Sequence, residues 1–247
     1  MQAHQSSHGS HLVVPILVFH KIGPVPPDSS YPRNYVRPEQ FDALLASLRR
    51  AGYESIGFEQ YLAHRRGRGT LPRKPIILTF DDGYRSNAEI AVPIMRKHGY
   101  TATIFVVPGR LGQSNSWDTE ERQEPLLSAD EIRALRAEGF TFGSHTMNHA
   151  RLTAVSPELA LEELRASRVA LEALLQEPVN VICYPWAQHD ANVRRLAQDA
   201  GYECGVGIWR RLNRDDTDVM ALHRIPVRYL DSTWSVRWEL FRLRYRH

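Results

Sequence analysis

Cysteine is scarce in this chain of 247 residues, which contains only Cys183 and Cys204. Two cysteines cannot build the disulfide scaffold of a small secreted domain. Both lie inside apolar runs that are typical of strands, so we expect two buried thiols. The alternative is a single bridge between neighbouring strands.

Long apolar runs are also absent, because no stretch approaches the roughly 20 apolar residues that span a bilayer. The run from Leu12 to Phe19 has no basic region before it and no small-residue cleavage site after it, so we interpret it as a strand. No signal peptide is visible, and the compartment stays open, although the substrate class proposed below points to the cell envelope. Residues 1–11 are polar and predict a disordered tail, in which His4, His8 and His11 lack neighbours that would fix a metal geometry.

A strong excess of one charge is missing too. The chain has 31 basic and 28 acidic residues, which gives a formal net charge of +3. This excess is too small to argue for nucleic acid or for acidic lipid as a partner. The hydrophobic content of 43% allows a sizeable core, so the composition is that of an ordinary globular protein.

Strand-like apolar runs alternate with amphipathic helical stretches along most of the chain, which is the pattern of an α/β domain with a parallel sheet. Seven such units close most economically into an irregular (β/α)7-8 barrel, with its active site at the carboxyl ends of the strands. An open doubly wound sheet is the structural alternative. No repeat or linker interrupts the series, so we predict one domain over residues 12–230. The predicted strands are 13–19, 75–80, 102–107, 140–144, 181–184, 203–208 and 223–227, with a further candidate at 53–58.

The predicted helices carry start and stop signals. Ser128 and Glu131 form a capping box at the start of one helix. Another helix begins after Ser156 and ends at Pro178. Asp190 is the expected cap of a shorter one.

Two adjacent carboxylates, Asp81 and Asp82, directly follow the predicted strand 75–80. Gly83 lets the backbone turn at once, so the two side chains need not point to opposite faces. One carboxylate could bind a metal while its neighbour handles protons. An Asp-Asp-Gly sequence is often only a turn, and the residues alone leave the two aspartates interchangeable.

His145 and His149 follow the predicted strand 140–144, and histidines four apart meet on one face if this segment turns helically. With one carboxylate they supply two nitrogens and one oxygen, the ligand count of a catalytic zinc site that keeps a position open for water. Such a pair is often only a surface feature. Because both motifs follow strands of one parallel sheet, we expect them to meet at the same end of the fold.

These motifs resemble those of a known family. Thr79-Phe80-Asp81-Asp82-Gly83 looks like the first motif of the polysaccharide deacetylases, the carbohydrate esterases with the NodB homology domain. The segments His145 to His149 and Tyr184-Pro185-Trp186 look like the second and third motifs. Val18-Phe19-His20 resembles the first strand of the branch that deacetylates poly-N-acetylglucosamine. The resemblance covers about residues 12–230 and implies an irregular barrel, one divalent metal ion and removal of acetyl groups from an N-acetylated sugar.

The resemblance also implies roles. Asp82, His145 and His149 would bind the metal, with zinc expected and cobalt or nickel as alternatives, and Asp81 would be the general base. Zn²⁺ lowers the pKa of its water to roughly 7, and a carboxylate beside it can then accept the proton. The backbone N–H of Trp186 would donate to the oxyanion.

The third motif departs from the family pattern. Cys183 stands where an arginine usually holds the catalytic aspartate, and Trp186 and Ala187 replace the usual tyrosine and glycine. The missing arginine puts the orientation of Asp81 in question. The poly-N-acetylglucosamine branch also tends to lack this arginine.

A substitute lies in the predicted strand 223–227, which resembles the fifth motif of the family. Side chains alternate along a strand, so only one of His223 and Arg224 can readily enter the site. Arg224 would hold Asp81, whereas His223 would be the general acid. His20, after the first strand, is a third candidate for the acid, with a hydrogen-bonded structural histidine as the alternative.

Residues 231–247 predict a C-terminal amphipathic helix, with Trp234, Trp238, Phe241 and Tyr245 on one face and arginines nearby. We expect this helix to pack on the barrel, and a basic amphipathic helix lying on a membrane surface is the alternative. We predict a monomeric, metal-dependent polysaccharide N-deacetylase that acts on a glycan containing N-acetylglucosamine. The rivals are a related hydrolase of a small non-sugar amide and a non-catalytic glycan-binding relative.

Overall fold

The computed structural model describes residues 13–245, so the predicted tail and its three histidines lie outside the described residues. The strands of the described part are β1 (Ile16–Phe19), β2 (Lys21–Ile22), β3 (Tyr35–Val36), β4 (Glu54–Ser55), β5 (Pro75–Phe80), β6 (Thr103–Val106), β7 (Thr141–Ser144), β8 (Val181–Cys183), β9 (Cys204–Val206) and β10 (Ile225–Pro226). The α-helices are α1 (Pro38–Arg50), α2 (Phe58–Arg65), α3 (Val92–His98), α4 (Ala129–Ala137), α5 (Pro157–Leu175), α6 (Ala191–Asp199) and α7 (Thr233–Tyr245).

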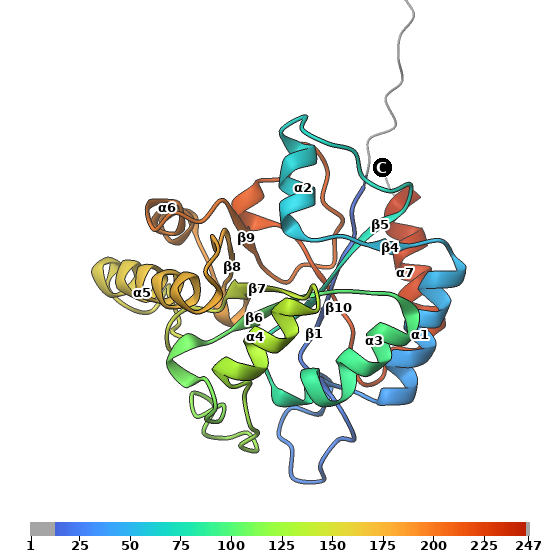
Figure 1. The fold of residues 1–247 in the computed structure, drawn as a ribbon, viewed down its shortest axis with the longest axis horizontal. Helices are drawn as coiled ribbons and strands as arrows, with labels where there is room; N and C mark the ends of the chain where they lie inside the picture. The colour runs from blue at the N-terminus through green and yellow to red at the C-terminus, as the bar shows by residue number, and fades with distance from the viewer. Residues whose placement is uncertain (1–12, 246–247) are drawn as a thin grey trace, which may run out of the picture.

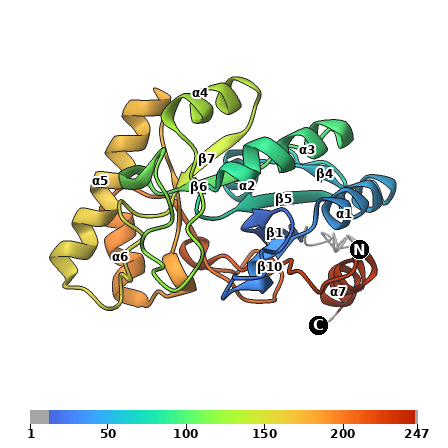
Figure 2. The same ribbon diagram turned by 90° about the horizontal axis from the view of Figure 1, so that it is seen from below.

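The main sheet is parallel and curled, with the strand order β10-β1-β5-β6-β7-β8-β9 and with β4 paired to β5. Each strand lies beside the next main strand along the chain, and the last returns next to the first. A doubly wound sheet would instead reverse its strand order at a switch point. The helices surround the strands (Figures 1 and 2). The predicted irregular barrel is therefore confirmed, and the alternative prediction of an open doubly wound sheet is wrong.

The two ends of the sheet meet through the segment that leads into β10. Leu222 donates its N–H to the carbonyl oxygen of Gly205 at 2.8 Å and accepts from the N–H of Gly207 at 3.0 Å. Gly205 is required for this approach, because a Cβ atom there would lie 2.6 Å from the carbonyl oxygen of Met220.

Alternating side chains of the strands divide the core into two hydrophobic clusters. In β5, Ile76, Leu78 and Phe80 pack in the cluster that includes the outer helices, whereas Ile77 packs in the smaller inner cluster. The period of two therefore directs Thr79, and Asp81 after it, toward the inside of the barrel. All six residues of β5 are buried because both faces of the sheet are covered.

Several helices begin at the capping residues that the sequence predicted. The hydroxyl of Ser128 accepts from the N–H of Glu131 and the carboxylate of Glu131 accepts from the N–H of Ser128, so the capping box is confirmed. Asp190 caps α6 by accepting from the N–H of Val193 at 2.8 Å. Both cysteines are free and buried, which also confirms the prediction. None of the described helices is long and apolar enough to cross a bilayer.

We predict that replacing Gly205 by Ala destabilises the protein, because the added methyl group meets backbone where the barrel closes. Overpacking of this kind costs roughly 1–3 kcal/mol, which thermal or urea unfolding would detect. Gly23→Ala is the matched control, since its Cβ would meet only Ile90, at 3.9 Å. Equal stability of the two variants would contradict this prediction, because the contact that closes the barrel would then tolerate a side chain at position 205.

Candidate active site

Asp81 and Asp82 lie where β5 ends, at the carboxyl edge of the barrel. Both are buried, with 2% and 7% of their surface exposed. The chain turns immediately, since Asp82 and Gly83 have left-handed φ angles of 71° and 72°. A Cβ at Gly83 would come within 2.8 Å of Val106, so this turn needs glycine. The turn predicted from the sequence is present, and it separates the directions of the two carboxylates.

His145 and His149 follow β7 and converge on Asp82. The Nε2 atom of each imidazole lies 3.3 Å from Oδ1 of Asp82. The segment between them does not turn helically, because Thr146 and His149 have left-handed φ angles of 64° and 62°. The histidines meet across an irregular loop instead. The three candidate ligand atoms lie within 4.8 Å of one another.

The donor set of these three residues fits a divalent metal. Nδ1 of His145 is 2.7 Å from the carbonyl oxygen of Cys183. A carbonyl only accepts, so Nδ1 carries a hydrogen, and Nε2 is the ring nitrogen that faces Asp82 and that a metal ion would use. Burial would raise the pKa of Asp82, but its bonds with His145 and His149 outweigh burial and hold the pKa well below its ordinary value. Two imidazole nitrogens facing one ionised carboxylate form a suitable zinc-type site.

Backbone strain gathers around this group. Positive φ angles in residues other than glycine cost free energy and tend to mark functional sites. Six such residues occur in the described part of the chain, and only Gln176, at the end of α5, lies outside the site segments. The other five are Asp82, Thr146, His149, Trp186 and Ala187.

Arg224 lies in the site and forms a bidentate ion pair with Asp81. It is completely buried, and its Nη1 and Nη2 donate to the two carboxylate oxygens at 2.6 and 2.8 Å. Further bonds to the hydroxyl of Thr79 and the carbonyl of Gly207 hold the guanidinium. Burial would raise the pKa of Asp81, but the charge of Arg224 outweighs it, so the pKa lies below its ordinary value and the carboxylate is ionised.

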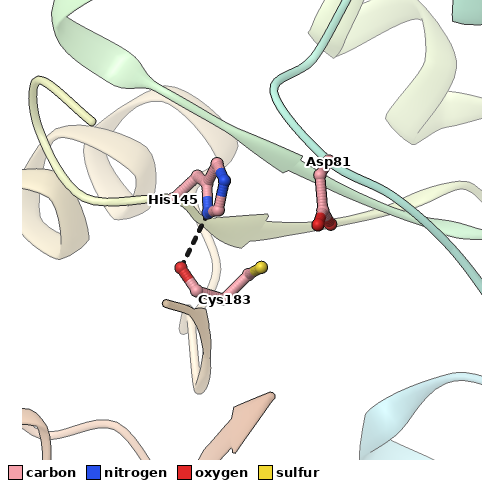
Figure 3. A group of neighbouring side chains, drawn as sticks. All are labelled: Asp81, His145 and Cys183. Atoms are coloured by element: carbon pink, nitrogen blue, oxygen red, sulfur yellow. Dashed lines mark hydrogen bonds between the residues drawn. The ribbon is translucent and has the colours of Figure 1, made fainter. Parts of the chain in front are cut away.

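Cys183 lies close to Asp81 and His145 (Figure 3). Its sulfur lies 3.0 Å from Nη2 of Arg224, so the arginine from β10's segment fills the neighbourhood in which the family's missing arginine would be expected. Asp81, His145 and Cys183 also cluster closely enough to suggest a metal group. That group is the weaker one, because burial raises the pKa of the Cys183 thiol and Arg224 already occupies both oxygens of Asp81.

The two candidate acids lie in different places. His20 lines a cleft of about 90 Å³ that is also lined by both aspartates and by the candidate ligands His145 and His149. Its Nε2 is 3.9 Å from Oδ2 of Asp81. His223 does not line this cleft, and its ring lies against Trp209, with 5.6 Å between ring centres. Its backbone is held by two hydrogen bonds with Asn213.

Two tryptophans, Trp117 and Trp186, pack against the candidate ligand His149. Trp117 stacks on its ring at 4.5 Å, and Trp186 meets it edge to face at 5.1 Å. The guanidinium of Arg151 lies 3.9 Å from the centre of the Trp186 ring. Sequence reasoning selected Trp186 only for its backbone and missed Trp117 and Arg151, because neither belongs to a motif or a periodic pattern.

A buried ion pair supports the loop that carries Trp117. Lys21, next to His20, donates to Glu121 at 3.1 Å, and both side chains are almost fully buried. Glu121 also accepts from the hydroxyl of Ser29 and the N–H of Tyr31, so it joins two loops at the cleft. The sequence predicts neither partner, because Lys21 follows the predicted strand 13–19 and Glu121 belongs to no motif or periodic pattern.

Comparison with known proteins agrees with this geometry. Residues 68–205, more than half of the chain, match the family model described as polysaccharide deacetylase. The chain therefore belongs to the polysaccharide deacetylase family, and the resemblance noted in the sequence is confirmed.

Individual relatives are distant but similar over most of their length. YxkH of Bacillus subtilis, named for the same family, is 25% identical over 87% of this chain and 71% of its own. The poly-beta-1,6-N-acetyl-D-glucosamine N-deacetylase of Staphylococcus aureus is 22% identical over 79% of this chain and 69% of its own. The deacetylase PplD of Streptococcus pyogenes, solved with acetate, has a TM-score of 0.82 and 24% identity, covering 93% of this chain and 98% of its own. The last similarity confirms the fold.

Proposed function

We propose that this protein is a metal-dependent hydrolase that removes N-acetyl groups from a glycan containing N-acetylglucosamine. The observation that carries the proposal is the joint arrangement of a three-ligand metal group and an ionised Asp81 clamped by Arg224. The glycan is inferred from the Staphylococcus aureus relative, whose name specifies poly-N-acetylglucosamine. The substrate class in turn favours the cell envelope as the place of action.

The non-catalytic rival rests on the missing arginine of the third motif. Arg224 removes that basis, since it contacts both oxygens of Asp81 from another strand. The hydrolase of a small non-sugar amide remains as the second candidate function. The open cleft with two aromatic walls favours a sugar over a small amide, because apolar ring faces suit aromatic walls.

Asp81 is the proposed general base. Asp82, His145 and His149 would hold a divalent cation, zinc before cobalt or nickel, which when bound supplies positive charge for activating water and polarising the acetamide carbonyl. Asp81 accepts the proton of the attacking water, and Arg224 keeps the carboxylate ionised and fixed in direction. Arg224 is thus a positioning residue.

Two further groups complete the proposed reaction. The backbone N–H of Trp186 donates to the acetamide oxygen as negative charge develops there. The leaving amine needs a proton, and His20 is the proposed donor, because it lines the cleft with Asp81 and remains partly exposed. His223 has a structural role in this proposal, because its ring packs against Trp209 on the other side of the chain from Arg224.

Acetate release from N-acetylglucosamine oligomers and from poly-N-acetylglucosamine, with and without a chelator, tests the function together with metal analysis. We expect release to stop on chelation and to return with zinc. Asp81→Asn should lower turnover by roughly 10²–10⁴-fold while metal stays bound, since it removes only the base. Asp82→Asn should lose metal affinity.

Two results would contradict this assignment. Acetate release that survives complete metal removal would exclude the metal mechanism. Loss of metal by Asp81→Asn with retention by Asp82→Asn would mean that the aspartates have the opposite roles.

Replacing His20 by Gln should lower the rate of acetate release by about 10²-fold or more, because the imidazole is the proposed acid. His223→Gln is the matched control and should keep the wild-type rate. A normal rate for His20→Gln with a collapsed rate for His223→Gln would reassign the acid to His223.

A further inference from the structure

Helix α7 is apolar on two opposite faces. Val236 and Leu240 join the main core and are only 3% exposed. On the other face Trp234, Trp238 and Phe241 are 72%, 51% and 55% exposed. The barrel covers one face of α7, so the other face indicates a surface for a partner.

The exposed aromatic side chains form one stripe. Trp234 stacks on Trp238, and Trp238 on Phe241, with ring centres 5.7 Å apart in both pairs. Together with Leu230 they make four of the eight large hydrophobic side chains that are exposed in the described part of the chain. We call Trp234, Trp238 and Phe241 the aromatic stripe. Gathered apolar side chains of this kind mark interaction surfaces.

Positive charge borders the aromatic stripe. By helical periodicity Arg237 and Arg242 lie on its two sides, and both are exposed. Glu239 is the only acidic residue of α7, and it is turned inward, 9% exposed and paired with Arg210. The face that α7 presents is therefore aromatic and basic, even though the net charge of the whole chain is small.

The basic border continues onto the barrel. Arg73 and Lys74, just before β5, line a hollow of about 370 Å³ together with Arg237 and Phe241. Cations from two separate segments thus meet beside the stripe. Figure 2 shows α7 at the outer edge of the molecule, and α1 packs against it.

We propose that this face of α7 docks the protein on the surface of an anionic lipid bilayer. Tryptophan rings prefer the boundary between headgroups and hydrocarbon, and arginines beside them attract anionic headgroups. A glycan fits the face less well, because the arginines would repel the ammonium groups of a deacetylated product, an argument that rests on the proposed function.

Vesicle co-sedimentation of the full-length protein tests the proposal. We expect binding to vesicles of equal parts phosphatidylglycerol and phosphatidylcholine, weak binding to phosphatidylcholine alone, and weaker binding at high salt. The combined variant Trp234→Ser, Trp238→Ser and Phe241→Ser should lose affinity for the mixed vesicles by at least about tenfold. Leu159→Ser with Val169→Ser, which removes two exposed apolar side chains of α5, is the matched control and should bind normally.

A second variant tests charge without touching the aromatic rings. Arg73→Glu with Arg242→Glu should lose the preference for the anionic vesicles. Acetate release from soluble N-acetylglucosamine oligomers and the melting temperature should stay unchanged in both variants, which separates this proposal from the proposed function.

Three results would overturn the proposal. One is equal sedimentation of the wild-type protein and the aromatic variant, or no sedimentation of either. Another is a dimer of the wild-type protein in light scattering that is absent in the aromatic variant, together with no binding of the wild-type protein to vesicles. The face would then bind a second copy of the chain. The third is loss of binding to insoluble glycan by the aromatic variant with vesicle binding intact.

Discussion

The buried ion pair between Arg224 and Asp81 is the interaction on which the rest of the site depends. Burying two charges is expensive, and the cost is offset only when geometry is good and the remaining donors are satisfied. Arg224 meets both conditions, with two bonds to Asp81 and others to Thr79 and Gly207. The pair therefore connects β5 to the strand that returns beside β1, and it fixes a charged carboxylate beside the candidate metal ligands.

The barrel makes this pair possible because its strands alternate between two environments. Thr79 and Asp81 face inward along β5, and Arg224 faces inward just before β10, with only β1 between the two strands. Next to them, the turns after β5 and β7 carry strained residues that aim Asp82 and the two histidines at one point. Regular strands thus supply the positions, and the irregular turns at their ends supply the directions.

Much of this was predictable from the sequence, for physical reasons. Strongly apolar runs placed the main strands, and residues at their carboxyl ends had to gather at one rim, so Asp81, Asp82, His145 and His149 could be identified. Alternation also showed that His223 and Arg224 could not both enter. It could not say which one does, because β10 has only two residues and its phase is set by pairing with β1.

Other parts of the site depend on tertiary contacts that no local pattern records. The two histidines meet across an irregular loop with left-handed residues at positions 146 and 149, and not across a helical turn. Trp117 reaches His149 from a long loop that the Lys21–Glu121 pair holds in place. The outward aromatic face of α7 was visible as a stripe, but only the packing of Val236 and Leu240 shows which side the barrel covers.

The most direct measurement of the central claim is a double-mutant cycle on the rate of acetate release. Lysine at position 224 keeps a positive charge but cannot form the bidentate hydrogen bonds with Asp81. If Arg224 acts through Asp81, Arg224→Lys will lower the rate of the wild-type enzyme and have almost no further effect in the Asp81→Asn background. The same fold loss in both backgrounds would contradict the account, because Arg224 would then act independently of Asp81.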